Sequence, residues 1–322
     1  MIVVTGGAGF IGSCFIKHLN NKGIKDILVV DSFGKSSKWK NLVGKKYIDF
    51  MNKDDFRNLL TDDGSFPFEV EAIIHLGACS STTEDDVDYL FDNNYQYSKD
   101  LALFALNNKI KFIYASSAAT YGFGESGYSD DEFENLKPLN AYGFSKYMFD
   151  EWVINSGLDK TFVGLKFFNV FGPNEYHKDN MASMVYKSFQ QIKSTGKVNL
   201  FKSNSLEYKD GEQKRDFVYV KDCCEIIYQF IQKPKKNGIY NVGNGNSSTW
   251  RVLIDNVFKA MNLESKIEFV EMPDQIKFQY QNFTEANITK LTKAIGKHKF
   301  MTLEESVNDY VKNYLNSSYQ YY

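Results

Sequence analysis

The stretch Ile2-Val3-Val4-Thr5-Gly6-Gly7-Ala8-Gly9-Phe10-Ile11-Gly12 determines the fold class. Its first four residues predict a short buried strand, its glycines predict a tight turn, and the apolar periodicity that continues to about Gly23 predicts a helix. A strand, a glycine turn and a helix in this order form the context that a dinucleotide-binding fingerprint requires. We expect Gly6 to permit the turn, Gly9 to let the backbone approach a pyrophosphate, and Gly12 to let the helix pack on the strand.

Further apolar runs alternate with helical patterns along the first half of the chain. These runs are residues 27–31, 72–78, 111–117 and 162–168, and the polar segment 49–55 is interpreted as following a third strand. Such alternation predicts an α/β fold, a doubly wound parallel Rossmann sheet with a smaller mixed C-terminal part. We expect a dinucleotide-binding domain over residues 1–170, to which part of 216–245 returns, and a mainly substrate-binding domain over 171–322.

Composition excludes several classes of protein. Hydrophobic residues make up 43% and charged residues 24% of the 322 residues, and the net charge of -2 gives no reason to expect a nucleic-acid or anionic-membrane partner. No apolar run approaches the roughly 20 residues of a membrane helix, and a strand that begins at Ile2 leaves no room for a signal peptide. We therefore expect a cytoplasmic protein without a membrane partner.

The four cysteines are Cys14, Cys79, Cys223 and Cys224. Their scatter fits neither a disulfide framework nor metal-ligand spacing, so we expect free thiols and no metal site. His75 lies inside the apolar run 72–78, which favours a buried histidine with satisfied hydrogen bonds over a catalytic one. The segment 79–84, Cys-Ser-Ser-Thr-Thr-Glu, predicts a hydroxyl-rich helix cap.

Asp31 ends the second predicted strand about 20 residues after the glycine turn, where an acid binds a ribose hydroxyl and favours NAD. Four lysines nearby in sequence or fold point the other way, because they could hold the 2′-phosphate of NADP. They are Lys35, Lys38, Lys40 and Lys53. The residues alone leave the choice between NAD and NADP open.

Tyr142 and Lys146 lie four residues apart in Tyr142-Gly143-Phe144-Ser145-Lys146, so a helix places them on one face. A lysine beside a tyrosine favours the phenolate, and we expect Lys146 to lower the pKa of Tyr142 toward neutrality. Such a phenol can take a proton from a sugar hydroxyl while hydride leaves the same carbon.

These motifs together resemble the extended short-chain dehydrogenase/reductase family, including its Gly-x-x-Gly-x-x-Gly spacing. In that family the reactive hydroxyl lies four residues before the tyrosine of a Tyr-Gly pair, here Tyr121-Gly122, which selects Ser117 over Ser116. Dehydratases of the family carry an Asp-Glu pair directly after the reactive hydroxyl. The residues here are Ala118 and Ala119, which cannot transfer protons, so the resemblance argues against dehydration.

Several less common stretches are similar to the ADP-L-glycero-D-manno-heptose 6-epimerase family of bacterial heptose supply. They are residues 77–84, 93–99, 114–122, 177–178, 181–183, 215–220 and 280–281. The resemblance implies oxidation of the sixth sugar carbon by bound NADP, followed by reduction on the opposite face. It implies catalytic roles for Ser117, Tyr142, Lys146 and Lys178, with Tyr142 serving one epimer and Lys178 the other. It also implies a nucleotide-sugar substrate and a homo-oligomer, a pentamer.

The resemblance further implies two sets of binding residues. The cofactor set is Gly6, Gly9, Phe10, Ile11, Gly12, Asp31, Ser32, Lys38, Lys53, Leu76, Gly77, Ala78, Cys79, Ser80, Asn93, Lys146, Val170 and Lys178, with Lys38 and Lys53 on the 2′-phosphate. The substrate set is Asn169, Asn180, Lys187, Phe201, Arg215 and Tyr280. For Arg215 the sequence leaves open a pyrophosphate contact or a structural ion pair.

Two departures from the family leave the sugar and the nucleotide open. Asn180 and Lys187 replace the usual Ser and His, and the polar segment between Phe201 and Arg215 is longer. One alternative is a UDP-sugar 4-epimerase, which does not need a second base at Lys178. The other is a non-catalytic dinucleotide-binding regulator.

Overall fold

The protein is described here from a computed structural model, which covers residues 1–61, 68–233 and 236–322. A seven-stranded parallel sheet forms its centre, with strand order β11-β6-β5-β4-β1-β2-β3. The strands are β1 (Ile2–Thr5), β2 (Ile27–Asp31), β3 (Asp49–Asn52), β4 (Ala72–His75), β5 (Lys111–Ser117), β6 (Val163–Phe167) and β11 (Gly238–Val242). The predicted doubly wound α/β fold is confirmed.

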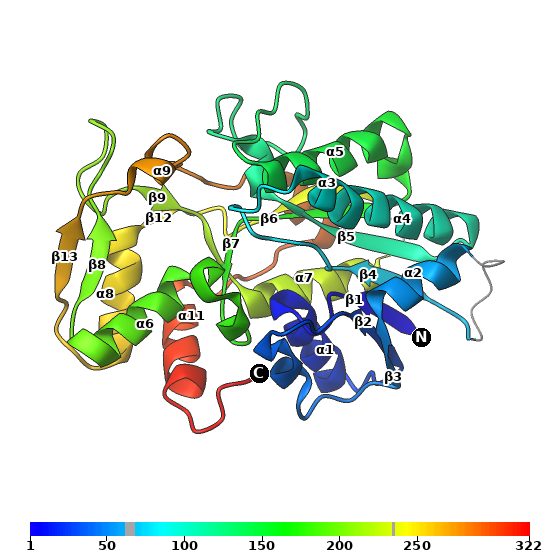
Figure 1. Cartoon of the computed structure of the whole chain (residues 1–322), viewed down its shortest axis with the longest axis horizontal. Helices are drawn as coiled ribbons and strands as arrows, with labels where there is room; N and C mark the ends of the chain where they lie inside the picture. Colours follow the sequence, from blue (N-terminus) through cyan, green and yellow to red (C-terminus); the bar gives the residue numbers. More distant parts are fainter. Residues whose placement is uncertain (62–67, 234–235) are drawn as a thin grey trace.

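Helices cover both faces of this sheet (Figure 1). One face carries α1 (Phe10–Asn21) and α7 (Val220–Gln232), and the other carries α2 (Lys53–Thr61), α4 (Tyr97–Asn107) and α5 (Ala141–Asn155). Successive strand residues point to opposite faces, so Ile2 and Val4 enter the core on the α1 side while Val3 enters the core on the α4 side. Both faces are buried, which explains the continuous apolar runs in the sequence.

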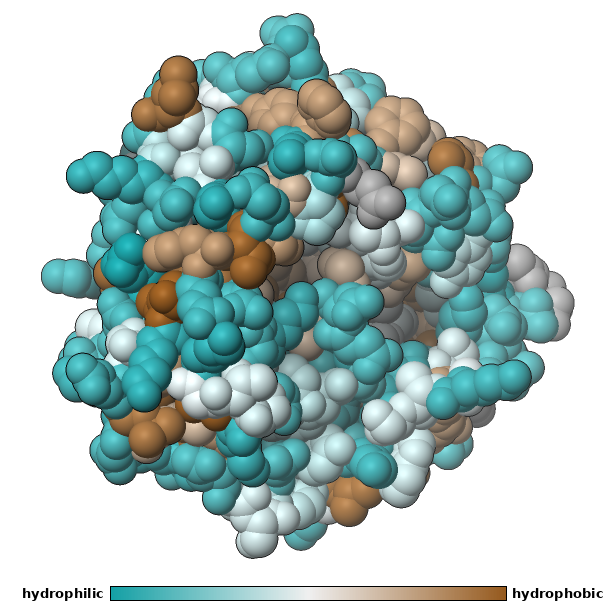
Figure 2. All heavy atoms as spheres, turned by 60° about the vertical axis from the view of Figure 1, so that its left-hand side comes forward, coloured by the Kyte–Doolittle hydropathy of each residue, from teal (hydrophilic) through white to brown (hydrophobic). Residues whose placement is uncertain are grey.

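The C-terminal part is smaller and mixed, as expected. Its strands form three pairs: β7 (Asn169–Phe171) with β10 (Phe217–Tyr219), β8 (Val198–Phe201) with β13 (Ile267–Val270), and β9 (Lys214–Arg215) with β12 (Ser248–Thr249). Its helices are α6 (Met184–Thr195), α8 (Trp250–Ala260), α9 (Asp274–Lys277), α10 (Thr289–Ile295) and α11 (Leu303–Tyr310). On the face where this part comes forward, hydrophilic side chains predominate and surround a central hollow (Figure 2).

Short helical segments connect the larger elements. They are η1 (Ser37–Leu42), α3 (Val87–Leu90), η2 (Phe91–Gln96), η3 (Ala118–Tyr121), η4 (Leu158–Lys160), η5 (Tyr176–Met181) and η6 (Val311–Leu315). We propose to keep the predicted domain division, residues 1–170 with part of 216–245 and then the rest of 171–322. Its support is that β11 pairs with β6 while α7 packs on α1.

Two local predictions are wrong. Asp49–Asn52 is itself the third strand, and its low apolar content reflects an edge position where side chains stay exposed or half-buried. The segment 79–84 does not cap a helix, because Asp86 is the N-cap of α3 and accepts a hydrogen bond from the Tyr89 amide at 2.9 Å.

Candidate active site

The glycine turn between β1 and α1 is closely packed against neighbouring backbone. Gly6 has φ +66°, and a Cβ on it would lie 2.6 Å from the Gly77 backbone. A Cβ on Gly12 would lie 2.2 Å from the carbonyl oxygen of Gly6. Within residues 1–61, the first turn of α1 contains no acid, and no side chain caps the helix at its N-cap residue, Gly9. The free amides at this end of the helix therefore form a site for an anion.

Two neighbouring cavities, which share lining residues such as Gly6 and Asp31, lie over this turn at the carboxyl ends of the strands. The larger has a volume of about 520 Å³ and the smaller about 130 Å³. Every residue of the predicted cofactor set lines one of them, with Ser32, Lys53 and Asn93 in the smaller. The predicted catalytic residues Ser117, Tyr142, Lys146 and Lys178 all line the larger.

The smaller cavity brings an acid and two lysines together. The Asp31 carboxylate accepts hydrogen bonds from the Ala8 amide at 2.9 Å, the Ser32 amide at 2.7 Å and Lys38 Nζ at 2.6 Å. Lys53 Nζ donates to Asn93 Oδ1 at 2.7 Å. The charge of Asp31, which would repel a 2′-phosphate, is thus compensated by Lys38. Lys35 and Lys40 are absent from the described lining of either cavity.

Tyr142 and Lys146 lie in the first turns of α5, which Asn140 caps by accepting a hydrogen bond from the Gly143 amide at 2.8 Å. Ser117 ends β5, and its side chain is hydrogen-bonded to the Tyr142 phenol. Ser117 Oγ also accepts from the Ala119 amide at 3.1 Å, which leaves its own proton available to a neighbouring oxygen. A helix and a strand end therefore converge on one point of the cavity.

The expected effect of Lys146 on Tyr142 is wrong in this structure. Burial raises the pKa of the Tyr142 phenol, and the hydrogen bond from Ser117 opposes this rise. The Lys146 ammonium is turned to the Ala115 carbonyl oxygen at 2.9 Å, and burial lowers its own pKa to about 8. Desolvation therefore outweighs the predicted lowering of the phenol pKa.

Lys178 faces the same cavity from η5, a short 3₁₀ segment that is interrupted by a kink at Asp179. Its Nζ lies 3.3 Å from Ser80 Oγ and 5.9 Å from the centre of the Phe10 ring. Burial lowers the pKa of Lys178, while the buried Glu175 opposes that change. Lys178 is half-buried, and its lowered pKa favours the neutral amine. Asp179, which follows it, has the left-handed φ of 45°.

Glu175 holds the segment that carries Lys178. This buried carboxylate accepts hydrogen bonds from the Ser183 amide at 2.6 Å, Ser183 Oγ at 2.7 Å and the Gly172 amide at 3.4 Å. One side chain thus joins the two ends of the segment 172–183. Nothing in the sequence pattern distinguished Glu175 from a surface acid.

His177 lines the larger cavity but was given no role from the sequence. Its Nδ1 lies 3.3 Å from Asn41 Nδ2. Burial, reinforced by the nearby charges of Lys178 and Lys38, lowers the His177 pKa to about 4, so the ring is neutral at pH 7. Its place in the stretch 177–178, which carried the resemblance, is the signal that could have found it.

The predicted substrate set is not brought together with the catalytic residues. Among the residues that the structure describes as lining the two cavities, none of Asn169, Asn180, Lys187, Phe201, Arg215 and Tyr280 occurs. Asn180 and Lys187 meet each other, since Lys187 Nζ donates to the Asn180 carbonyl oxygen at 2.6 Å. Their binding roles stay predictions.

Arg215 is buried among aromatic rings. Its guanidinium lies 5.5 Å from the Trp250 ring centre and 5.2 Å from that of Tyr280, and it donates to the carbonyl oxygens of Lys214 and Gln281. It has no ion-pair partner in the part of the chain that the structure describes. Among the described residues the ion-pair alternative thus finds no support, and the pyrophosphate contact stays a prediction.

Other chemistry-bearing side chains have structural surroundings. His75 is buried, its ring nitrogens lie 2.6 Å from Thr5 Oγ1 and 2.8 Å from Ser98 Oγ, and burial lowers its pKa to about 3, as expected of a core histidine. All four cysteines are free. Over the described residues, no cluster of three metal-ligating side chains occurs, and no helix is long and apolar enough to cross a membrane.

The fold and these sites agree with what comparison with known proteins shows. The chain belongs to the NAD dependent epimerase/dehydratase family, whose model matches residues 2–243. A relative named ADP-L-glycero-D-manno-heptose-6-epimerase, from Nitratidesulfovibrio vulgaris (strain DP4), is 48% identical over 317 residues, which cover 98% of each chain. The resemblance seen in the sequence is thus confirmed.

Solved structures give the same result. The crystal structure of an ADP-L-glycero-D-manno-heptose-6-epimerase from Helicobacter pylori matches with a TM-score of 0.82 and 30% identity, over 97% of this chain and 95% of that one. A UDP-N-acetylglucosamine 4-epimerase from Methanobrevibacter ruminantium M1 matches with a TM-score of 0.81 and 25% identity, over 97% and 96%. These two enzymes are named for different sugars, so the shared fold does not by itself identify the substrate.

Proposed function

We propose that the protein is an isomerase that interconverts the D-glycero and L-glycero forms of ADP-glycero-manno-heptose at the sixth sugar carbon, with bound NADP. The observation that carries this proposal is the presence of two proton-transfer groups in one cavity, Tyr142 and Lys178. The near full-length similarity to a relative named for this activity supports it. The sixth carbon lies outside the sugar ring, and one fixed phenol cannot reach both orientations of its hydroxyl, so its inversion needs a second acid/base group.

The cavities fit a dinucleotide. The turn at Gly6 has no room for a side chain, and the uncapped end of α1 suits a pyrophosphate. Asp31 and Asn93 suit the adenosine ribose, and Lys38 and Lys53 suit a 2′-phosphate, which favours NADP over NAD. When bound, the nicotinamide supplies a hydride acceptor and donor.

The protein's own residues then handle the protons. Because burial raises the pKa of Tyr142, its phenol carries a proton, which it donates to the carbonyl oxygen when one epimer forms, and the resulting phenolate takes the proton back in the reverse reaction. Ser117 Oγ donates a hydrogen bond to the reacting oxygen. Lys146 holds the nicotinamide ribose. Lys178 Nζ serves the other epimer, because its lowered pKa makes the neutral amine more accessible near pH 7. The loops 79–86 and 172–183, which meet at the contact of Thr82 Oγ1 with Met181 Sδ at 3.8 Å, restrict water.

A UDP-sugar 4-epimerase is the second candidate, since the solved 4-epimerase shares the fold at nearly the same TM-score. That reaction does not need Lys178. A non-catalytic regulator is disfavoured because Ser117, Tyr142 and Lys146 converge in the cavity.

The test of the function is direct. Purified protein is incubated with ADP-D-glycero-manno-heptose, with UDP-glucose and with dTDP-glucose, and the products are separated by chromatography. We expect interconversion of the ADP-heptose epimers and no 4-keto-6-deoxy product, because Ala118 and Ala119 cannot transfer protons. Turnover of UDP-glucose alone would establish the second candidate instead.

The cofactor, the assembly and the location are tested separately. Mass spectrometry of the denatured protein should release NADP; release of NAD alone would remove the 2′-phosphate role of Lys38 and Lys53. Lys53→Ala should weaken NADP binding about tenfold and leave NAD binding unchanged, since one lysine–phosphate contact is lost.

Light scattering tests the proposed homo-oligomer, for which a pentamer is expected. We propose a cytoplasmic location, which cell fractionation tests.

A further inference from the structure

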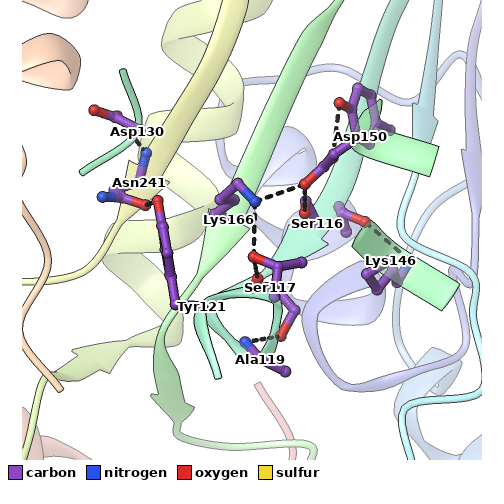
Figure 3. A network of polar contacts seen from close by, with 12 residues as sticks. Ser116, Ser117, Ala119, Tyr121, Asp130, Lys146, Asp150, Lys166 and Asn241 are labelled. Carbon is purple, nitrogen blue, oxygen red and sulfur yellow. Dashed lines mark hydrogen bonds and ion pairs between the residues drawn. The ribbon is translucent and has the colours of Figure 1, made fainter. Parts of the chain in front are cut away.

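A buried ion pair joins α5 to β6 near Ser117 (Figure 3). Asp150 on α5 and Lys166 on β6 are 1% and 0% exposed, and Lys166 Nζ lies 2.7 Å from Asp150 Oδ2. Desolvation of two charges offsets most of their attraction, so such a pair is weak evidence for stability alone. The role of the pair is therefore inferred from its contacts with neighbouring residues.

The carboxylate of the pair joins α5 to β5. Asp150 Oδ1 accepts a hydrogen bond from Tyr114 Oη at 3.0 Å, and Asp150 Oδ2 accepts one from Ser116 Oγ at 2.6 Å. Both donors belong to the last residues of β5 before Ser117. The helix that carries Tyr142 is thereby fixed to the strand that carries Ser117.

The ammonium group of Lys166 is linked to the backbone of Ser117 through Thr120. Lys166 Nζ donates to Thr120 Oγ1 at 2.7 Å, and Thr120 Oγ1 donates to the Ser117 carbonyl oxygen at 2.9 Å. The remaining side of the ammonium faces the Tyr121 ring, 5.0 Å from its centre. The backbone of Ser117 is therefore linked through one hydroxyl to a buried cation.

We propose that Asp150 and Lys166 are positioning residues, which hold Ser117 against α5 and keep the charge behind Tyr142 and Lys146 balanced. Asp150 lies four residues after Lys146 and eight after Tyr142, so all three share one face of the helix. The inference rests on the proposed function, because it assigns the pair to the oxidation and reduction at Ser117 and Tyr142.

The electrostatic part concerns the groups that face the catalytic pair. Burial raises the pKa of Tyr142 most, and the hydrogen bond from Ser117 lowers it. Cys79 on the loop after β4 and Asp150 on α5 both raise it further. The same two groups raise the pKa of Lys146 against the opposing effect of burial. The charge of Asp150, and any cation that compensates it, therefore influences the pKa values of both Tyr142 and Lys146.

The remaining neighbours do not supply this balance. His75 on β4 interacts with Lys146, but burial lowers its pKa to about 3, so it is neutral at pH 7. Burial raises the pKa of the Cys79 thiol, and Lys178 faces it from η5. Lys166 is thus the cation in direct contact with Asp150.

The test measures the titration of Tyr142 directly, without substrate, in full-length protein labelled with 13Cζ-tyrosine. The Tyr142 resonance is assigned by its loss in Tyr142→Phe. Lys166→Met leaves Asp150 uncompensated, so the Tyr142 pKa should rise by about one pH unit relative to the unaltered protein. Asp150→Asn should lower it by a similar amount, and the double variant should restore it.

The double variant also separates charge from position, and it keeps the test decisive if Lys166→Met does not fold. A thioether has no proton to donate to Thr120, so kcat should fall about tenfold at unchanged KM although the Tyr142 pKa is restored. Lys221→Met is the matched control, because Lys221 pairs with Asp309 at 2.7 Å on another part of the molecule. It should not move the Tyr142 pKa.

A Tyr142 pKa that stays fixed in Asp150→Asn and in Lys166→Met would overturn the proposal, as would an equal shift in Lys221→Met. The NMR titration needs no turnover. Absence of epimerisation by the unaltered protein would therefore refute the proposed function, and the titration would still decide whether the pair acts on Tyr142.

Discussion

Tyr142 and Lys178 face one cavity from two different kinds of backbone. Tyr142 lies near the start of the 15-residue helix α5, capped by Asn140 and tied to β5 through Asp150. Lys178 lies on a short 3₁₀ segment, beside a residue of left-handed φ, and the Glu175 carboxylate joins the ends of the surrounding segment 172–183. A helix and a strand thus fix the position of Tyr142, whereas the side chain of Glu175 fixes the segment that carries Lys178.

The largest expected effect is at the helix-borne group. Tyr142→Phe removes the phenolic hydroxyl that transfers the proton, and we expect epimerisation to fall about 10³-fold. Cofactor content should be unchanged, because Tyr142 does not form the glycine turn. Tyr147→Phe is the control, since Tyr147 lies on the same helix and its hydroxyl donates to Glu151. Chromatography of the two heptose epimers measures both variants; equal activity of Tyr142→Phe and the control would refute the role.

The second largest effect is expected at Lys178, the acid/base group on the loop. Lys178→Met should lower epimerisation about 10²-fold, since the second configuration loses its acid/base group. The control is Lys193→Met, an exposed lysine on α6. If Lys178→Met kept normal turnover while Tyr142→Phe did not, the two-base mechanism would be wrong and the 4-epimerase interpretation would gain.

The carboxylate that holds the loop should have an intermediate effect. Glu175→Gln places an amide donor against the amide donors of Ser183 or Gly172, so we expect about a tenfold lower kcat and a loss of about 1–3 kcal/mol in the free energy of unfolding. Glu285→Gln is a close control, because Glu285 accepts from the Ser247 amide at 2.9 Å and from its hydroxyl at 2.6 Å. The control should lose stability and keep kcat. An equal loss of kcat in both variants would contradict the role of Glu175 in holding the segment that carries Lys178.

The smallest effect concerns the backbone next to Lys178. Asp179→Gly relieves the left-handed conformation, and we expect the unfolding midpoint to rise by about 2 °C. The freer segment should lower kcat no more than about threefold. Asn262→Gly, at φ 57° after α8, should raise the midpoint and leave kcat unchanged. A fall of the midpoint in Asp179→Gly would show that the left-handed backbone is not strained.

The same contrast explains what the sequence could predict. Strand and helix periodicity identified the sheet, and the spacing of Tyr142 and Lys146 identified the helix-borne site, because both are local patterns. Lys178 was found only through resemblance, since a 3₁₀ segment has no extended periodicity. The direction of the Tyr142 pKa was wrong because burial and the turn of Lys146 toward Ala115 depend on tertiary packing.

Other residues depended on long-range contacts alone. His177 faces the cavity because Asn41 and the η5 segment meet, which no local spacing reveals. Lys166 sits in an apolar strand run, and only the fold shows that its partner is Asp150. The substrate set lies outside the described cavity linings, so family similarity alone does not establish those contacts.

The position of β11 has a consequence for synthesis on the ribosome. This strand pairs with β6 at one edge of the central sheet, although the long C-terminal segment from β7 to α7 is made between them. At about 5–20 residues per second, the β6 edge waits on the order of ten seconds for its partner. During that time its backbone groups can pair with another chain. The nascent chain is therefore most exposed to aggregation just before Gly238–Val242 leaves the exit tunnel, where chaperone protection matters most.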